Sequence, residues 1–172
     1  MKTGSSFSSP SWPPPQSPKL QRLILFFVTG AGTGYLPWFP GTAGTLVAIP
    51  FSLALNRMAN ASLPLSLLTF IAFVGIATWL CKQGEEIFQE NDCPKIVIDE
   101  VAGFLLANFF APPQLKPVAL AFLLFRFFDI IKVFPAARAE RISGGLGVML
   151  DDLIAGLYTA VILRLLLWWG LV

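Results

Sequence analysis

Five carboxylates lie inside apolar segments of this sequence, and they are the side chains best suited to chemistry. They fall in three short motifs, "IVIDE", "FRFFDIIK" and "GVMLDD", and they are Asp99, Glu100, Asp129, Asp151 and Asp152. A charged residue at the centre of a membrane helix costs about 2.5–3.5 kcal/mol on insertion scales, so such residues are functional candidates. We therefore take all five as candidate catalytic residues.

The same motifs hold only two cations, Arg126 and Lys132, so the group carries an excess of negative charge. A hard divalent cation with oxygen ligands would balance this excess, and Mg²⁺ is the usual choice beside phosphate. The sequence therefore predicts a Mg²⁺ site whose ligands are Asp99, Glu100, Asp129 and one of the pair Asp151 and Asp152, of which we take Asp152.

Arg126, Asp129 and Lys132 recur at every third position, which makes them neighbours on a helix surface. One interpretation is an ion triplet that only lowers the cost of membrane insertion. The other is a substrate-binding site in which Arg126, Lys132 and the later Arg138 hold phosphate oxygens. We favour the second, because ion pairing within this helix would leave the carboxylates of the other two motifs without cations.

Two glycine-rich segments, residues 29–45 and 143–152, frame the acidic motifs. The first contains G-x-G-x-G but no G-K-[ST], so it gives little support to nucleotide binding. Its backbone N–H groups around Gly41 and Thr42 are candidates for binding an anion at a helix start. The alternative is a membrane hairpin turn shaped by prolines. The second segment leads into Asp151, where acidic residues favour the start of a helix.

Several enzyme classes are excluded by residue types that the sequence lacks. It has no histidine, which rules out His bases, Ser-His-Asp triads and His-based lipid phosphatases. No Cys-x5-Arg, D-x-D or D-G-x-x-A-R motif is present. We expect Cys81 and Cys93 to be unpaired thiols without a metal role. A net charge of +2 gives no support to nucleic-acid binding.

The composition is that of a membrane protein. The 172 residues are 55% hydrophobic and 13% charged, with a mean hydropathy of +0.70, whereas soluble domains are about 25% charged. Two segments, 63–81 and 153–172, reach the length of about 20 apolar residues that a span requires. Segment 45–59 holds Pro50, and segments 96–111 and 118–134 are shorter and charged.

We therefore predict an all-α, small polytopic membrane helix bundle with four to five spans, the smaller number leaving one re-entrant segment. Residues 1–21, rich in Ser and Pro, are expected to be a disordered tail. Residues 22–172 would form the membrane domain. Arg164, deep in the last span and outside any motif, is interpreted as snorkelling or as a structural pair.

The basic residues orient this bundle. With a cytoplasmic N-terminus, two of them fall outside, Arg57 and Lys116. Eight fall inside, and they are Lys2, Lys19, Arg22, Lys82, Lys95, Lys132, Arg138 and Arg141. This distribution follows the positive-inside rule and places the acidic motifs at the cytoplasmic ends of their helices.

The chain resembles the phosphatidylglycerophosphatase A family. Four motifs carry the resemblance, in the family's order: "GTGYLPWFPGTAGT", "IVIDEVAG", "FRFFDIIK" and "GGLGVMLDDLIAG". The family's acidic pair falls on Asp99 and Glu100, its R-x-F-D-x-x-K pattern begins at Arg126, and Asp92 matches an acidic position before the first acidic motif. One departure is that Lys132 is followed by Val-Phe-Pro where the family often has Pro-x-Pro.

This resemblance implies a Mg²⁺-dependent membrane enzyme of phospholipid biosynthesis. It would convert phosphatidylglycerophosphate to phosphatidylglycerol and phosphate, in the bacterial inner membrane, with the active site on the cytoplasmic side. The residues themselves leave two alternatives open. One is a small transporter with a charge-lined pathway, which predicts charges spread through the membrane depth. The other is a non-catalytic scaffold, which gives no reason for so many buried acids.

Overall fold

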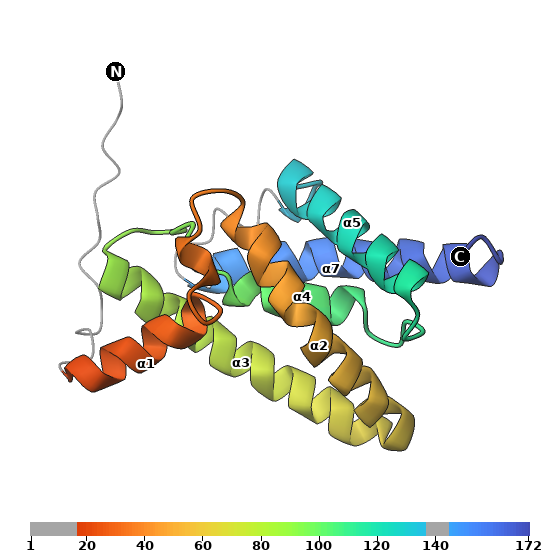
Figure 1. Ribbon diagram of the computed structural model, residues 1–172, viewed down its shortest axis with the longest axis horizontal. Helices are drawn as coiled ribbons and strands as arrows, with labels where there is room; N and C mark the ends of the chain where they lie inside the picture. Colours follow the sequence, from red (N-terminus) through yellow and green to blue (C-terminus); the bar gives the residue numbers. More distant parts are fainter. Residues whose placement is uncertain (1–16, 137–144) are drawn as a thin grey trace.

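A computed structural model describes residues 17–136 and 145–172, and within these ranges the chain is helical without strands (Figure 1). The predicted phosphate-binding residue Arg138 lies outside the described residues. The helices are α1 (Pro18–Val28), α2 (Pro40–Ala61), α3 (Leu63–Phe88), α4 (Ile98–Ala107), α5 (Leu115–Ile131) and α7 (Gly145–Trp168), with a short 3₁₀ turn, η1 (Thr33–Tyr35), before α2. The all-α prediction is thus confirmed for the described part of the chain.

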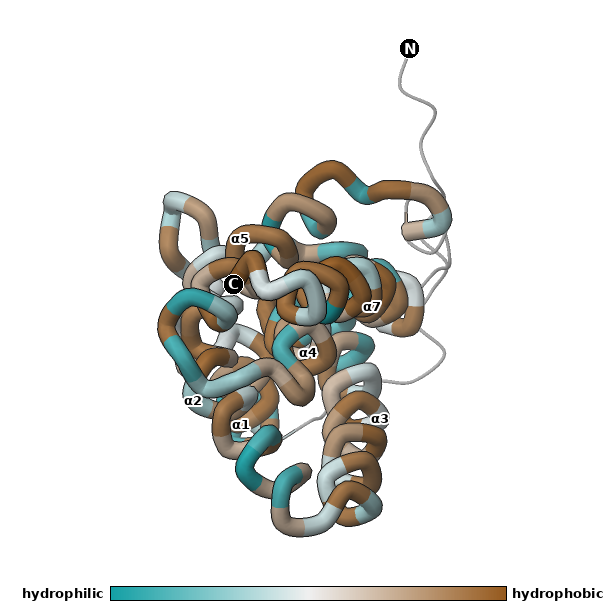
Figure 2. The backbone as a smooth tube through the Cα atoms, turned by 90° about the vertical axis from the view of Figure 1, so that its right-hand side faces the viewer, coloured by the Kyte–Doolittle hydropathy of each residue, from teal (hydrophilic) through white to brown (hydrophobic). Residues whose placement is uncertain are grey.

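Two of the described helices, α3 with 26 residues and α7 with 24, are long and apolar enough to cross a membrane. Figure 2 shows long apolar stretches on both. Helices α4 and α5, expected as short spans, have only 10 and 17 residues. At 1.5 Å per residue α4 is about 15 Å long, about half the hydrocarbon thickness of a bilayer. The number of four to five spans therefore stays a prediction.

The short helix α4 lies at the centre of the bundle, in contact with α2, α3, α5 and α7. Eight of its ten residues are buried. Phe104 packs against Phe125 of α5 with ring centroids 6.0 Å apart, and both side chains are fully buried. Because α4 is enclosed on several sides, its two ends are held at fixed places relative to the surrounding helices.

Glycines allow the backbones of α4 and α7 to touch. A Cβ atom added at Gly156 would lie 2.3 Å from the carbonyl oxygen of Gly103, and one at Gly103 would lie 2.7 Å from the carbonyl oxygen of Asp152. Small residues at such crossings let helices approach closely in membranes. This contact sets the acidic first turn of α4 beside Asp152, the eighth residue of α7. The prediction that Asp151 and Asp152 open a helix is therefore wrong, because α7 has already begun at Gly145.

The C-terminal end of α4 is held by polar side chains from other helices. Asn56 of α2 donates to the Asn108 carbonyl over 2.8 Å and accepts from the Phe110 N–H over 2.8 Å. Arg164 of α7 donates to the carbonyls of Phe109 and Phe110, the latter over 2.6 Å. These bonds satisfy backbone groups that helix ends leave unpaired. Arg164 therefore makes the structural interaction that the sequence predicted for it.

Candidate functional site

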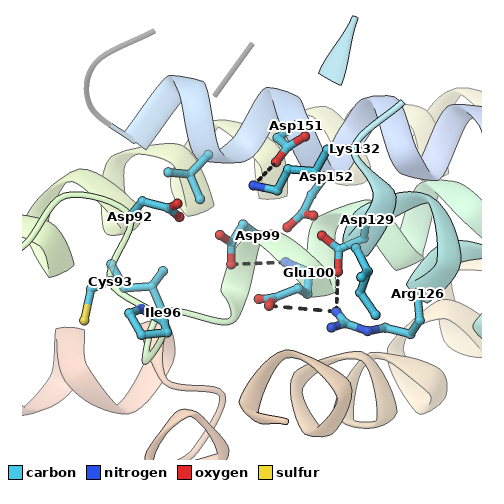
Figure 3. Close-up of a pocket in the computed structure, with 13 residues that line it drawn as sticks. Asp92, Cys93, Ile96, Asp99, Glu100, Arg126, Asp129, Lys132, Asp151 and Asp152 are labelled. Atoms are coloured by element: carbon cyan, nitrogen blue, oxygen red, sulfur yellow. Dashed lines mark hydrogen bonds and ion pairs between the residues drawn. The ribbon is translucent and has the colours of Figure 1, made fainter. Parts of the chain in front are cut away.

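A pocket of about 250 Å³ gathers the predicted charged residues at one end of the bundle (Figure 3). It is formed where α4 and α7 begin, where α5 ends, and by the loop between α3 and α4. The charged residues that line it are Asp92, Asp99, Glu100, Arg126, Asp129, Lys132, Asp151 and Asp152. Three segments far apart in the sequence thus contribute their acidic motifs to one site.

Three of the carboxylates form a compact group of oxygen donors. Asp99, Glu100 and Asp152 each offer an oxygen, and these oxygens all lie within 4.8 Å of one another. Asp99 and Asp152 are only 4% exposed, and Oε2 of Glu100 is buried without a hydrogen-bond partner. Asp99 and Glu100 occupy the first turn of α4, where the helix dipole favours negative charge. Buried carboxylate oxygens, one of which lacks a hydrogen-bond partner, are suitable ligands for a hard divalent cation.

The two cations of the site are each paired with a different carboxylate. Nη1 of Arg126 lies 2.5 Å from Oδ2 of Asp129, the pair expected from their i, i+3 spacing, and 4.0 Å from Oε1 of Glu100. Nζ of Lys132 lies 2.8 Å from Oδ2 of Asp151, which links the end of α5 to the start of α7. Asp129 therefore faces Arg126 on one side and Asp152 on the other, as Figure 3 shows.

Gly41 brings the N-terminus of α2 against this group. A Cβ atom at position 41 would lie 2.2 Å from Oε1 of Glu100 and 3.0 Å from Nη1 of Arg126. No larger residue fits here without moving one of these charged groups. Thr42 follows in the first turn of α2 and is half-buried, but neither Gly41 nor Thr42 belongs to the pocket lining. Their role in binding phosphate stays a prediction.

The loop before α4 adds residues that the motifs did not single out as catalytic. Asp92 is oriented by its backbone N–H, which donates to Oε1 of Glu85 over 3.0 Å. Cys93 lines the pocket. Both Cys93 and Cys81 are buried, free thiols, which confirms the prediction that they are unpaired. Burial raises the pKa of the Cys93 thiol, so it is poorly suited to act as a nucleophile.

Ile130 and Val148 also line the pocket. Neither carries a signal in the sequence, because an apolar residue in an apolar helix is unremarkable until its neighbours are known.

Known proteins resemble this chain over most of its length. The phosphatidylglycerophosphatase A family model matches residues 26–167. A phosphatidylglycerophosphatase A of Escherichia coli is 35% identical over 78% of this chain and 77% of its own length, and one of Haemophilus influenzae is 30% identical over 86% and 91%. A putative phosphatidylinositol-3-phosphatase of Bacteroides thetaiotaomicron is 34% identical over 81% and 91%.

No solved structure matches the chain. The family match covers all three acidic motifs, both cations of the pocket and the glycine at the start of α2. The site described above therefore lies within the matched region, and the chain belongs to the phosphatidylglycerophosphatase A family of phosphatases.

Proposed function

We propose that this protein hydrolyses the phosphomonoester of phosphatidylglycerophosphate and releases phosphatidylglycerol and inorganic phosphate. One observation carries the proposal: six carboxylates and two cations converge in one small pocket at the end of an apolar helix bundle. The names of the two bacterial phosphatidylglycerophosphatase A relatives supply the lipid. The third relative is named for a different lipid phosphate, so the choice of head group is the finer part of the proposal.

The acidic group would hold Mg²⁺ through Asp99, Glu100 and Asp152, whose oxygens lie within 4.8 Å of one another. Asp129, beside Asp152, is the fourth predicted ligand. When bound, the metal would polarise the phosphoryl group and lower the pKa of a water molecule. Without a cation, three buried carboxylates this close together repel one another and do not easily stay ionised. This is the physical reason for assigning a cation to them.

Arg126 and Lys132 would bind the phosphate. In the structure each is paired with a carboxylate, at 2.5 Å and 2.8 Å. A phosphate dianion offers both cations a stronger partner, so we expect them to turn toward it and to free Asp129 and Asp151. A freed carboxylate next to the phosphate can act as a general base toward water or as the nucleophile itself. Oxygen-isotope tracing in a single turnover distinguishes these two routes.

We further propose that the enzyme is a multi-pass protein of the bacterial inner membrane with the pocket on the cytoplasmic side. Two apolar helices, α3 and α7, support membrane insertion. The pocket lies at the end of the bundle that the positive-inside rule assigns to the cytoplasm, beside Lys132.

The direct test is phosphate release from phosphatidylglycerophosphate by the purified protein, with Mg²⁺ and with EDTA. We expect turnover only with the metal, and full turnover in EDTA would remove the metal from the proposal. Asp152→Asn should lower kcat at least 100-fold. The matched control is Glu90→Gln, an exposed acid outside the pocket that should retain full activity.

A transporter remains the second candidate from the sequence. It requires charges along a path through the membrane. The charged residues of the three acidic motifs gather instead in one pocket, and Arg164 at the other end of the bundle is bonded to backbone carbonyls. Solute flux into proteoliposomes without phosphate release would favour the transporter.

A further inference from the structure

One apolar side chain belongs both to the pocket and to the outer surface of the bundle. Ile130 lines the pocket together with the charged residues, yet it is 68% exposed. The other exposed residues of the described lining, Asp92 and Pro94, belong to the loop before α4, whereas Ile130 lies on a helix. The pocket is therefore open to the apolar surface at Ile130.

Ile130 continues into a stripe along the outer face of α5. Leu123, Phe127, Ile130 and Ile131 follow the i, i+4, i+7, i+8 spacing of one helix face, and each is more than half exposed. The opposite face of the helix packs into the core through Ala121 and Phe125, which are fully buried. The exposed residues, called here the α5 stripe, run about 12 Å from Leu123 to Ile131.

The same helix carries the two cations of the pocket. Lys132 directly follows the stripe at the end of α5, and Arg126 lies beside the stripe between Leu123 and Phe127; both line the pocket. This combination, cations on the pocket side and an apolar track on the outer side of one helix, is complementary to an amphiphile with an anionic head group.

The pocket is too small to hold the whole of such a molecule, so its apolar part must lie elsewhere. At about 250 Å³, the pocket is smaller than the roughly 300–1,000 Å³ of clefts that enclose drug-sized ligands. It can hold a phosphorylated glycerol but not two acyl chains. The chains of a diacyl lipid must therefore leave the pocket, and Ile130 marks an apolar way out.

We propose that the α5 stripe is the acyl-chain site of the substrate, with the lipid's glycerol passing Ile130 and its chains lying along Phe127 and Leu123. This inference rests on the proposed lipid phosphatase function and deepens it. It makes Ile130 a residue that distinguishes a membrane lipid from a water-soluble phosphomonoester with the same head group.

The kinetic test compares Leu123→Ser with Ile71→Ser, because Ile71 on α3 is equally exposed, at 64% against 63%, and both residues lie outside the pocket lining. Both variants are assayed with the diacyl lipid in detergent micelles and with its deacylated head group. We expect Leu123→Ser to raise KM for the lipid about tenfold, with kcat and head-group hydrolysis within twofold of the parent. Ile71→Ser should leave all values within twofold.

Two results would overturn the assignment: equal effects of the two variants, or an equal loss of activity toward the deacylated head group. If the parent protein hydrolyses neither substrate, the proposed function fails. Whether the α5 stripe binds the acyl chains is then tested by a measurement that does not need turnover. A benzophenone amino acid is placed at position 130 or 71 and irradiated with a radiolabelled phosphonate analogue of the lipid. At position 130 we expect a lipid adduct that excess unlabelled analogue suppresses. At position 71 the analogue should not suppress any adduct.

The other outcomes of the cross-linking contradict the proposal. Equal labelling at both positions without competition would mean that the stripe meets only bulk lipid. A cross-linked dimer at position 130 would mean that a second copy of the chain covers the stripe.

Discussion

Gly41→Ala should slow catalysis strongly while leaving the fold intact, and the structure allows the effect to be worked out. The new Cβ would lie 2.2 Å from Oε1 of Glu100, an approach that real Cβ atoms essentially never show. The nearest group is the end of a flexible side chain, so Glu100 can yield by about 1 Å at small cost to stability. A misplacement of about 1 Å in a catalytic site can cost 100-fold in rate. We therefore expect kcat/KM to fall about 100-fold.

The assay is phosphate release under saturating Mg²⁺, with the unfolding temperature in detergent measured in parallel. The matched control is Gly75→Ala on α3, where an added Cβ meets nothing within 4 Å. We expect this control to keep its activity. Shortening the displaced side chain, as in the double variant Gly41→Ala/Glu100→Asp, should restore part of the rate. The reasoning is refuted if Gly41→Ala keeps kcat/KM within threefold of the parent, or if it unfolds.

Three further substitutions test the rest of the arrangement. Gly156→Ala should destabilise the protein by about 1–3 kcal/mol, read as a lower unfolding temperature, because its Cβ would meet the rigid backbone of Gly103 at 2.3 Å; an unchanged temperature would contradict the helix contact. Asn56→Ala should cost about 1–3 kcal/mol, since it leaves buried backbone groups of the turn after α4 unpaired. Lys132→Gln should raise KM for the lipid about tenfold or more, because it removes a cation from the pocket, whereas Lys132→Arg should keep much of the affinity. The same KM in both variants would remove Lys132 from phosphate binding.

The convergence of the acidic motifs could be predicted from the sequence because charge inside apolar segments is a strong signal. The i, i+3 spacing also predicted that Arg126 and Asp129 are neighbours. No pattern in the sequence indicates the pair between Lys132 and Asp151, because this pair depends on how α5 and α7 pack. The contact of Gly41 with Glu100 could not be predicted for the same reason, because it depends on how α2 and α4 pack.

The length of α4 shows a different limit of sequence-based prediction. The apolar run 96–111, ended by two prolines, suggested a span that reaches Ala111. The helix ends at Ala107 instead. The turn that follows is stabilised by Asn56 from α2 and by Arg164 from α7, two partners more than 50 residues away in the sequence. A helix end that depends on such distant partners has no local signature.

The same contacts explain how the site is held in register. Helices α4 and α7 run in parallel, as Figure 1 shows. They meet at two levels, Asp99 with Asp152 and Gly103 with Gly156, and the turn after α4 meets α7 at a third level, Phe110 with Arg164. The partners are 53, 53 and 54 residues apart along the chain. A slip of one residue at any level would separate the carboxylates at the other end. Arg164, which lies about 18 Å along α7 from Asp152, therefore helps to fix the acidic group without touching it.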